Sequence, residues 1–345
     1  MANEVLPEAS TAQAQTEPTP EKGALWLRIL GIFLKQREAS IAVIAIVLTA
    51  YFWSSNPVFL SKENIGLLSQ YTAATAIIAC GEVMLLISGE IDLSVGYVYA
   101  LAPFIVYFAV ENYGLSLGLA VVVGLVISLL IGVINGVIVV YLGVPSLIAT
   151  LGSLLALNGI TLTISNDFPV LTPGTGTKFA EVMGHSTFSE IYWAIGIIIV
   201  MQIILSRTRW GLHTIATGSN LLGASEVGVN FRLIKMSNFM LTSLLGGFAG
   251  ILEAFRITSA TPGAGGTTIM FNAVAGAVIG GTALQGGSGT IIGGFLGVIV
   301  LSLLSDGFTL LGINANTFDI VIGGAILVAM ILNVRLQALR KAGKQ

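Results

Sequence analysis

Two carboxylates lie in the octapeptide GEIDLSVG, residues 89–96, between long apolar runs. Glu90 and Asp92 are bounded by Gly89 and Gly96, and Ser94 precedes the second apolar run. Carboxylates and irregular backbone survive at membrane depth only beside protein or water, so this stretch could line a polar path for a hydroxylated solute. A plain turn is the alternative, in which Asp92 or Ser94 caps the following helix. Spacing alone favours the turn, because charged residues are least costly near the membrane interface.

Composition places the chain among membrane proteins. Of its 345 residues, 55% are hydrophobic and 9% are charged, whereas soluble domains carry roughly 25% charged residues. Apolar runs of the roughly 17–25 residues that cross a bilayer recur from Ala39 to Leu332. We therefore expect an all-α polytopic membrane protein with about ten transmembrane helices. The expected spans are 39–59, 66–88, 94–112, 115–141, 144–166, 191–205, 237–261, 269–285, 290–313 and 317–334.

Basic residues predict the topology, because cytoplasmic loops are enriched in Lys and Arg. They cluster before the first span, in the loop 206–236 and after the last span, so both termini and this loop are expected in the cytoplasm and the loop 167–190 outside. The expected organisation is a disordered or amphipathic cytoplasmic tail (1–38), a transmembrane domain (39–334) and a basic cytoplasmic tail (335–345). The clustered basic residues are Lys22, Arg28, Lys35 and Arg37, then Arg207, Arg209, Arg232 and Lys235, and finally Arg335, Arg340, Lys341 and Lys344.

Several kinds of site are excluded by the sequence. Cys80 is the only cysteine, and His185 and His213 fall on opposite sides of the expected membrane, so neither a metal cluster nor a catalytic triad is predicted. No basic face for nucleic acid is present. The glycine-rich run GGTALQGGSGT (280–290) lacks the lysine of a phosphate-binding P-loop. We expect no cofactor bound by this chain, and any ATP used in transport must be hydrolysed by a partner subunit.

A weak internal repeat relates the two halves of the chain. NGVIVVYLGVPSLIATLG (135–152) aligns with DGFTLLGINANTFDIVIG (306–323), and ISGEIDLSVG (87–96) then aligns with ITSATPGAGG (257–266). The predicted topology inverts one copy relative to the other. Inverted repeats with broken helices at matching places point to a translocation path. Most of the 42 glycines are expected to allow close helix packing.

The motifs resemble those of a known family. GEIDLSVG is similar to the GGIDLSVG signature of ribose-type sugar ABC transporter permeases, within the branched-chain amino acid/ribose permease superfamily. VPSLIATLG (144–152), NLLGASEVGVN (220–230) and GGTALQGGSGTIIGGFLG (280–297) resemble further motifs of that family, in the same order. The resemblance extends from about Phe52 to Arg335.

This resemblance implies a transport subunit without enzymatic activity of its own. Its partners would be a cytoplasmic ABC ATPase, an extracytoplasmic sugar-binding protein and a second permease chain, identical or homologous, in the bacterial cytoplasmic membrane. The cargo would be a monosaccharide or polyol. Two departures stand out: Glu90 replaces a glycine of the signature, and Leu221-Leu222-Gly223 replaces a frequent Glu-Ala-Ala. The implied ATPase-coupling residues are Asn220, Gly223, Ala224, Ser225 and Gly228.

The expected substrate pathway uses neutral hydrogen-bonding groups, a ring and the carboxylates of the break. An ion-coupled secondary transporter of a small polar solute remains the alternative, because it would use titratable residues within the spans. The order of the motifs and the loop 206–236 favour the ABC permease. The pathway residues are Glu90, Asp92, Ser94, Asn135, Asn158, Phe271, Asn272 and Gln285. The carboxylates that the alternative would use are Glu82, Glu90, Asp92, Glu253, Asp306 and Asp319.

Overall fold

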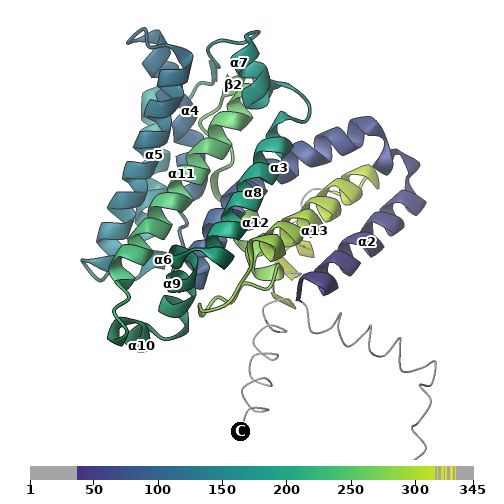
Figure 1. Ribbon diagram of the computed structural model, residues 1–345. Helices are drawn as coiled ribbons and strands as arrows, with labels where there is room; N and C mark the ends of the chain where they lie inside the picture. Colours follow the sequence, from purple (N-terminus) through teal and green to yellow (C-terminus); the bar gives the residue numbers. More distant parts are fainter. Residues whose placement is uncertain are drawn as a thin grey trace, which may run out of the picture. The chain divides into compact units, whose positions relative to one another are not determined.

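The computed structural model describes residues 37–314 and, beyond them, residues 317, 320, 321, 323, 324, 327, 328 and 331. These residues belong to one helical unit (Figure 1). The all-α class of the sequence prediction is confirmed, since the described part holds only two short strands, which pair with each other. The elements are α2 (Arg37–Ser55), η1 (Pro57–Leu60), α3 (Lys62–Ile87), α4 (Val95–Glu111), α5 (Leu117–Val140), α6 (Ser146–Ser165), β1 (Val170–Leu171), α7 (Lys178–Ala180), η2 (Glu181–His185), α8 (Ser189–Arg207), α9 (Arg209–Ser219), α10 (Leu221–Glu226), α11 (Phe231–Ile257), β2 (Ser259–Ala260), α12 (Gly266–Ile279) and α13 (Ile291–Leu310).

Helix length separates full spans from broken ones. Among the described residues, seven helices are long and apolar enough to cross a membrane: α2, α3, α5, α6, α8, α11 and α13. Two of the ten predicted spans correspond to helices that are too short to cross the hydrocarbon core. Helix α4 has 17 residues and rises about 26 Å, and α12 has 14 residues and rises about 21 Å, less than the roughly 30 Å of a hydrocarbon core. The tenth predicted span, 317–334, lies largely outside the described residues.

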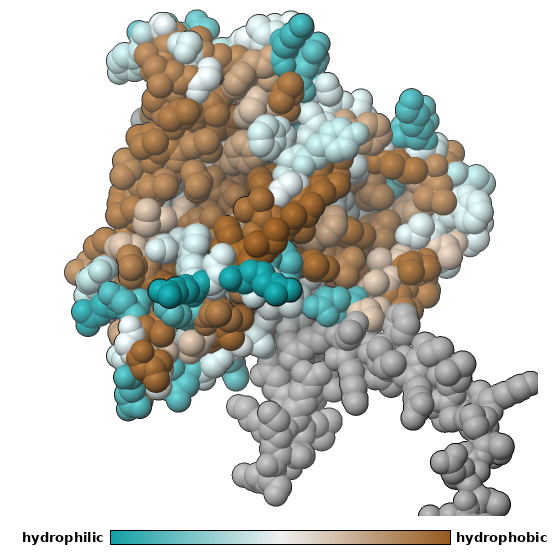
Figure 2. Space-filling view, viewed as in Figure 1, coloured by the Kyte–Doolittle hydropathy of each residue, from teal (hydrophilic) through white to brown (hydrophobic). Residues whose placement is uncertain are grey.

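The predicted loops lie at opposite ends of the unit. Helices α9 and α10, from the loop 206–236, occupy one end, and α7 and β2 lie at the other (Figure 1). We call these the α10 end and the α7 end. Between them, hydrophobic side chains cover the middle of the visible face, while hydrophilic groups gather toward both ends (Figure 2). This is the distribution expected of a membrane-spanning unit.

The lengths and directions of the helices agree with the proposed inverted repeat. In each half, a long helix, a break, a short helix and a second long helix follow one another: α3–α4–α5 and α11–α12–α13. Helices α3 and α11 run in opposite directions, since Gly66 at the start of α3 lies near Thr187, whereas Gly184 packs on Leu252 near the end of α11. Helix α3 ends at Ile87 and α11 ends at Ile257, and the internal alignment pairs these two residues.

The two short helices begin against each other. A Cβ atom added to Gly96 would lie 1.9 Å from the carbonyl oxygen of Gly266, so only glycine permits this approach. Gly96 and Gly266 are also the residues that the internal alignment pairs. On α11, an added Cβ at Gly250 would lie 2.0 Å from the carbonyl oxygen of Tyr99. These contacts are the packing role predicted for the glycines.

Candidate functional site

The break 88–94 turns sharply at the end of α3. Gly89 has a φ of +83°, which suits glycine, and the amide of Glu90 donates to the carbonyl of Leu85 over 3.1 Å. The chain then enters the interior, so that Asp92 and Ser94 are both fully buried. The break is therefore folded into the helix bundle and is more than a surface turn.

Asp92 is held by neutral donors. One carboxylate oxygen accepts from the Ser94 amide at 2.8 Å and from the Ser94 hydroxyl at 2.6 Å. The other oxygen accepts from the Asn135 side chain and from the Ser243 hydroxyl, both at 3.4 Å. Asn135, on α5, also donates to Ser94 Oγ at 2.8 Å and accepts from Ser153 of α6 at 2.5 Å. This Asp92 cluster joins α4, α5, α6 and α11.

The prediction that Asp92 or Ser94 caps the following helix is wrong. Ser94 occupies the N-cap position of α4 but makes no side-chain capping bond: its backbone is helical, with φ −76° and ψ −17°, and its hydroxyl donates to Asp92 and accepts from Asn135. Asp92 accepts the amide of Ser94 itself, one residue before the helix begins. The pair therefore fastens the break to the bundle rather than satisfying the first amides of α4.

Glu90 lies on the α10 side of this cluster. Its carboxylate forms an ion pair of 2.5 Å with Lys235, near the start of α11, and the two side chains are only 13% and 16% exposed. The next residue is also attached, since the amide of Ile91 donates to Ser146 Oγ at the start of α6 over 3.4 Å. The residue that departs from the family signature thus has a charged partner.

A cavity of about 780 Å³ lies among α3, α12, α13 and the C-terminal part of α11. We call it the α3–α13 cavity. It runs beside the first half of α3, toward the α7 end, and among its lining residues Asn64 of α3 donates to the Asp306 carboxylate of α13 at 2.6 Å. The polar residues that line it are Asn64, Gln70, Tyr71, Thr75, Tyr99, Glu253, Thr268, Asn272, Ser302, Ser305, Asp306 and Thr309.

Tight packing separates this cavity from the α10 end. A Cβ atom added to Gly297 of α13 would lie 2.0 Å from the carbonyl oxygen of Gly276 in α12. Further along, an added Cβ at Gly280 would lie 2.2 Å from the carbonyl oxygen of Gly293. The two helices therefore pack backbone to backbone between the cavity and the α10 end.

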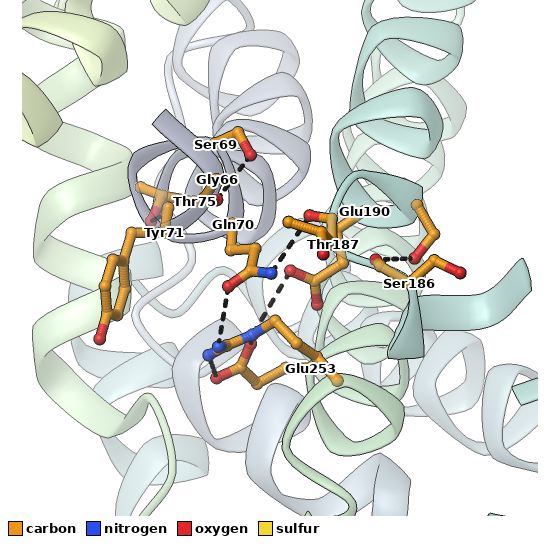
Figure 3. Close-up of polar contacts among 11 residues, drawn as sticks. Gly66, Ser69, Gln70, Tyr71, Thr75, Ser186, Thr187, Glu190 and Glu253 are labelled. Atoms are coloured by element: carbon orange, nitrogen blue, oxygen red, sulfur yellow. Dashed lines mark hydrogen bonds and ion pairs between the residues drawn. The ribbon is translucent and has the colours of Figure 1, made fainter. Parts of the chain in front are cut away.

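Two residues that line the cavity, Gln70 and Glu253, belong to a charged network, which Figure 3 shows. The Arg256 guanidinium is bound by both carboxylate oxygens of Glu253 and lies 3.5 Å from Glu190. It also donates to Gln70 Oε1 at 3.4 Å, and the Gln70 amide donates to the Thr187 carbonyl at 3.1 Å. The network joins α3, α8 and α11, and its two carboxylates share a single guanidinium.

The predicted pathway residues do not form one site. Asp92, Ser94 and Asn135 come together in the Asp92 cluster, and Asn272 lines the α3–α13 cavity. The remaining ones lie apart: Phe271 is 57% exposed on α12, Asn158 is half-buried on α6, Gln285 is exposed in the loop after α12, and Glu90 pairs with Lys235.

The carboxylates considered for ion coupling also separate. Glu253 and Asp306 line the cavity. Glu82 is buried in α3, and neither of its oxygens has a hydrogen-bond partner among the described residues. Asp319 lies outside the described residues.

Most of the residues that line the cavity were not predicted from the sequence. A signal was available in α13, where Ser302, Ser305, Asp306 and Thr309 follow the spacing of one helix face and all line the cavity. The contact between Gln70 and Arg256 could not be predicted from residue spacing, because these residues are 186 positions apart in the chain.

The predicted coupling segment forms the short helix α10. Asn220 is its N-cap, accepting from the Gly223 amide at 3.0 Å, and Gly228 follows the helix with a φ of +85°. Ala224 packs inward, whereas Ser225 is exposed. Two apolar side chains, Leu222 and Val227, are 77% and 80% exposed. The α10 end therefore presents an apolar surface on a capped helix.

Comparison with known proteins gives a consistent result. Residues 64–330 match the family described as branched-chain amino acid transport system / permease component. The chain is 37% identical to the xylose/arabinose import permease protein XylH of Sulfolobus acidocaldarius, over 89% of this chain and 87% of that protein. It is 33% identical to the ribose import permease protein RbsC of Escherichia coli, over 88% and 95%. Identity to the galactose/methyl galactoside import permease protein MglC of Salmonella typhimurium is 30%, over 88% and 96%. No solved structure gives a significant match.

Proposed function

The chain belongs to the family of branched-chain amino acid transport system permease components, and from this premise we propose that it is the membrane-spanning subunit of an ABC importer for a monosaccharide or polyol. The relatives are named as import permeases for xylose or arabinose, ribose and galactose. They lend no support to the ion-coupled alternative.

The α3–α13 cavity is the observation that carries the proposal. Its volume of about 780 Å³ lies within the range of small-molecule sites. Hydroxyl and amide groups from opposing helices dominate its polar lining, and such neutral donors and acceptors match a polyhydroxylated solute. Tyr71 adds an aromatic ring. We propose that the cavity is the part of the transport path nearest the external binding protein.

The energy for transport is proposed to come from a partner. The glycine-rich segment 280–290 packs against the protein's own backbone: the Gly287 amide donates to the Ile87 carbonyl at 2.8 Å, beside Gly218. It lacks a P-loop lysine. The exposed Leu222 and Val227 on and beside α10 suit insertion into an apolar cleft of an ABC ATPase. We therefore assign ATP hydrolysis to that subunit.

Orientation and assembly follow from this assignment. The α10 end faces the cytoplasm, which agrees with its basic residues Arg207, Arg209, Arg232 and Lys235. The α7 end faces the extracytoplasmic binding protein, and both termini are cytoplasmic in a bacterial cell membrane. A second permease chain, identical or homologous, completes the path, because ABC ATPases work as a pair.

Reconstitution tests the function directly. The permease, its co-purifying ATPase and the sugar-binding protein are placed in liposomes, and uptake of labelled pentoses and hexoses is measured. We expect ATP-dependent uptake that stops when the P-loop lysine of the ATPase is replaced by alanine. Uptake that survives this replacement, or that follows an imposed ion gradient without ATP, would contradict the proposal.

A further inference from the structure

The Glu90–Lys235 ion pair joins two segments that are 145 residues apart in the chain. Glu90 belongs to the break 88–94, two residues before the fully buried Asp92. Lys235 lies four residues after the start of α11. Both side chains are largely buried, so separating them would leave an unpaired charge in a region of low dielectric. The two segments are therefore expected to move together.

Lys235 is in turn fixed to α10. Helix α10 and the first turns of α11 share a small apolar cluster formed by Ala224, Val229 and Ile234. Asn230, between the two helices, caps α11 by accepting from the Leu233 amide at 3.1 Å. A displacement of α10 would thus be passed to the turn of α11 that carries Lys235.

A second contact links the same helix to the break. Ser243 lies eight residues beyond Lys235, about 12 Å further along α11, and its hydroxyl donates to Asp92 over 3.4 Å. Glu90 and Asp92 are therefore both attached to α11, one by an ion pair and one by a hydrogen bond. Because these two contacts lie at different positions along the axis of α11, a movement of α11 would displace the break 88–94 as a unit.

We infer that the Glu90–Lys235 ion pair couples the position of α10 to that of the break 88–94, which makes Glu90 a positioning residue for the transport cycle. The inference rests on the proposed function, because α10 is taken to contact the ATPase. The inference also gives a role to Glu90, which stands where the GGIDLSVG signature has a glycine. The ion pair transmits movement, while the Asp92 cluster keeps the break attached to its neighbours.

Charge exchange provides the test. In the reconstituted complex, sugar transported per ATP hydrolysed is measured for Glu90→Lys and for the double exchange Glu90→Lys/Lys235→Glu. Glu111→Lys is the matched control, because Glu111 is an exposed carboxylate at the end of α4. We expect Glu90→Lys to lower the ratio by about fivefold or more, the scale of coupling between linked sites. The double exchange should restore it to within about twofold, and the control should not change it.

The outcomes are separable. A wild-type complex that shows no ATP-dependent uptake would overturn the proposed function itself. A working wild-type complex in which folded Glu90→Lys keeps the normal ratio would overturn only the coupling role. The coupling role would also be overturned if the double exchange, with a melting temperature equal to that of the wild type, failed to recover the transport-to-hydrolysis ratio. The two charges would then act independently.

Discussion

Replacing Asp92 by leucine should destabilise the bundle far more than replacing it by asparagine. In Asp92→Leu, the Ser94 amide and the Ser94 hydroxyl lose the acceptor that they share at 2.8 Å and 2.6 Å. The buried Ser243 hydroxyl also loses its acceptor, and each buried donor left unpaired costs about 1–3 kcal/mol, so we expect a loss of about 3–9 kcal/mol in the free energy of unfolding. Asn135 is not left unpaired, because it still donates to Ser94 Oγ and accepts from Ser153.

Asp92→Asn keeps the oxygen that accepts both Ser94 donors. It weakens only the contacts to Asn135 and Ser243, which are long at 3.4 Å. Interhelical hydrogen bonds in membrane proteins average about 0.6 kcal/mol, so the expected loss is about 1 kcal/mol. The assay is thermal unfolding in detergent of both variants, followed by uptake per folded molecule in liposomes.

The contrast between the variants is the decisive result. Asp92→Leu should unfold at a clearly lower temperature than Asp92→Asn, and its uptake should fall further than its yield. Equal melting temperatures for wild type, Asp92→Asn and Asp92→Leu would contradict this prediction, because the hydrogen bonds to Asp92 would then add nothing to stability.

Three further predictions concern packing, docking and topology. Gly96→Val should abolish folded protein on size exclusion, because the added Cβ meets the Gly266 carbonyl, whereas Gly152→Val should be tolerated, because nothing lies within 4 Å of a Cβ there. Leu222→Asp should weaken co-purification of the ATPase without lowering the melting temperature, since Leu222 is 77% exposed; undiminished co-purification would place the docking surface elsewhere. A tag at residue 220 should be accessible only from the cytoplasm and one near residue 178 only from outside, and the reverse pattern would contradict the proposed orientation.

The sequence predicted the helices well because long apolar runs leave little choice of structure in a membrane. The predicted span 66–88 corresponds to Lys62–Ile87, and 94–112 to Val95–Glu111. The predicted span 269–285 extends too far, since α12 comprises Gly266–Ile279 and ends where the glycine-rich segment begins. Apolar content alone does not mark that end, which lies where Gly281 takes a φ of +90°.

The site was predicted only in part, for a physical reason. Asp92, Ser94 and Asn135 were chosen as polar residues in apolar runs, and they meet because such groups must find one another when buried. Which helix faces which was not available from one sequence, so the cavity residues Gln70 and Ser302 were missed. Likewise, the partner of Glu90 is known only from the fold, because the sequence places Lys235 among the basic residues of the loop 206–236.

A removable obstacle in the α3–α13 cavity tests most directly whether the sugar passes through it. Ser305 lines this cavity, and the natural Cys80 is buried and can be replaced by alanine. In Ser305→Cys/Cys80→Ala, complete modification by a bulky thiol-specific disulfide reagent should block ATP-dependent sugar uptake, and reduction should restore it. Full modification of the introduced thiol with uptake unchanged would show that the sugar does not pass through this cavity.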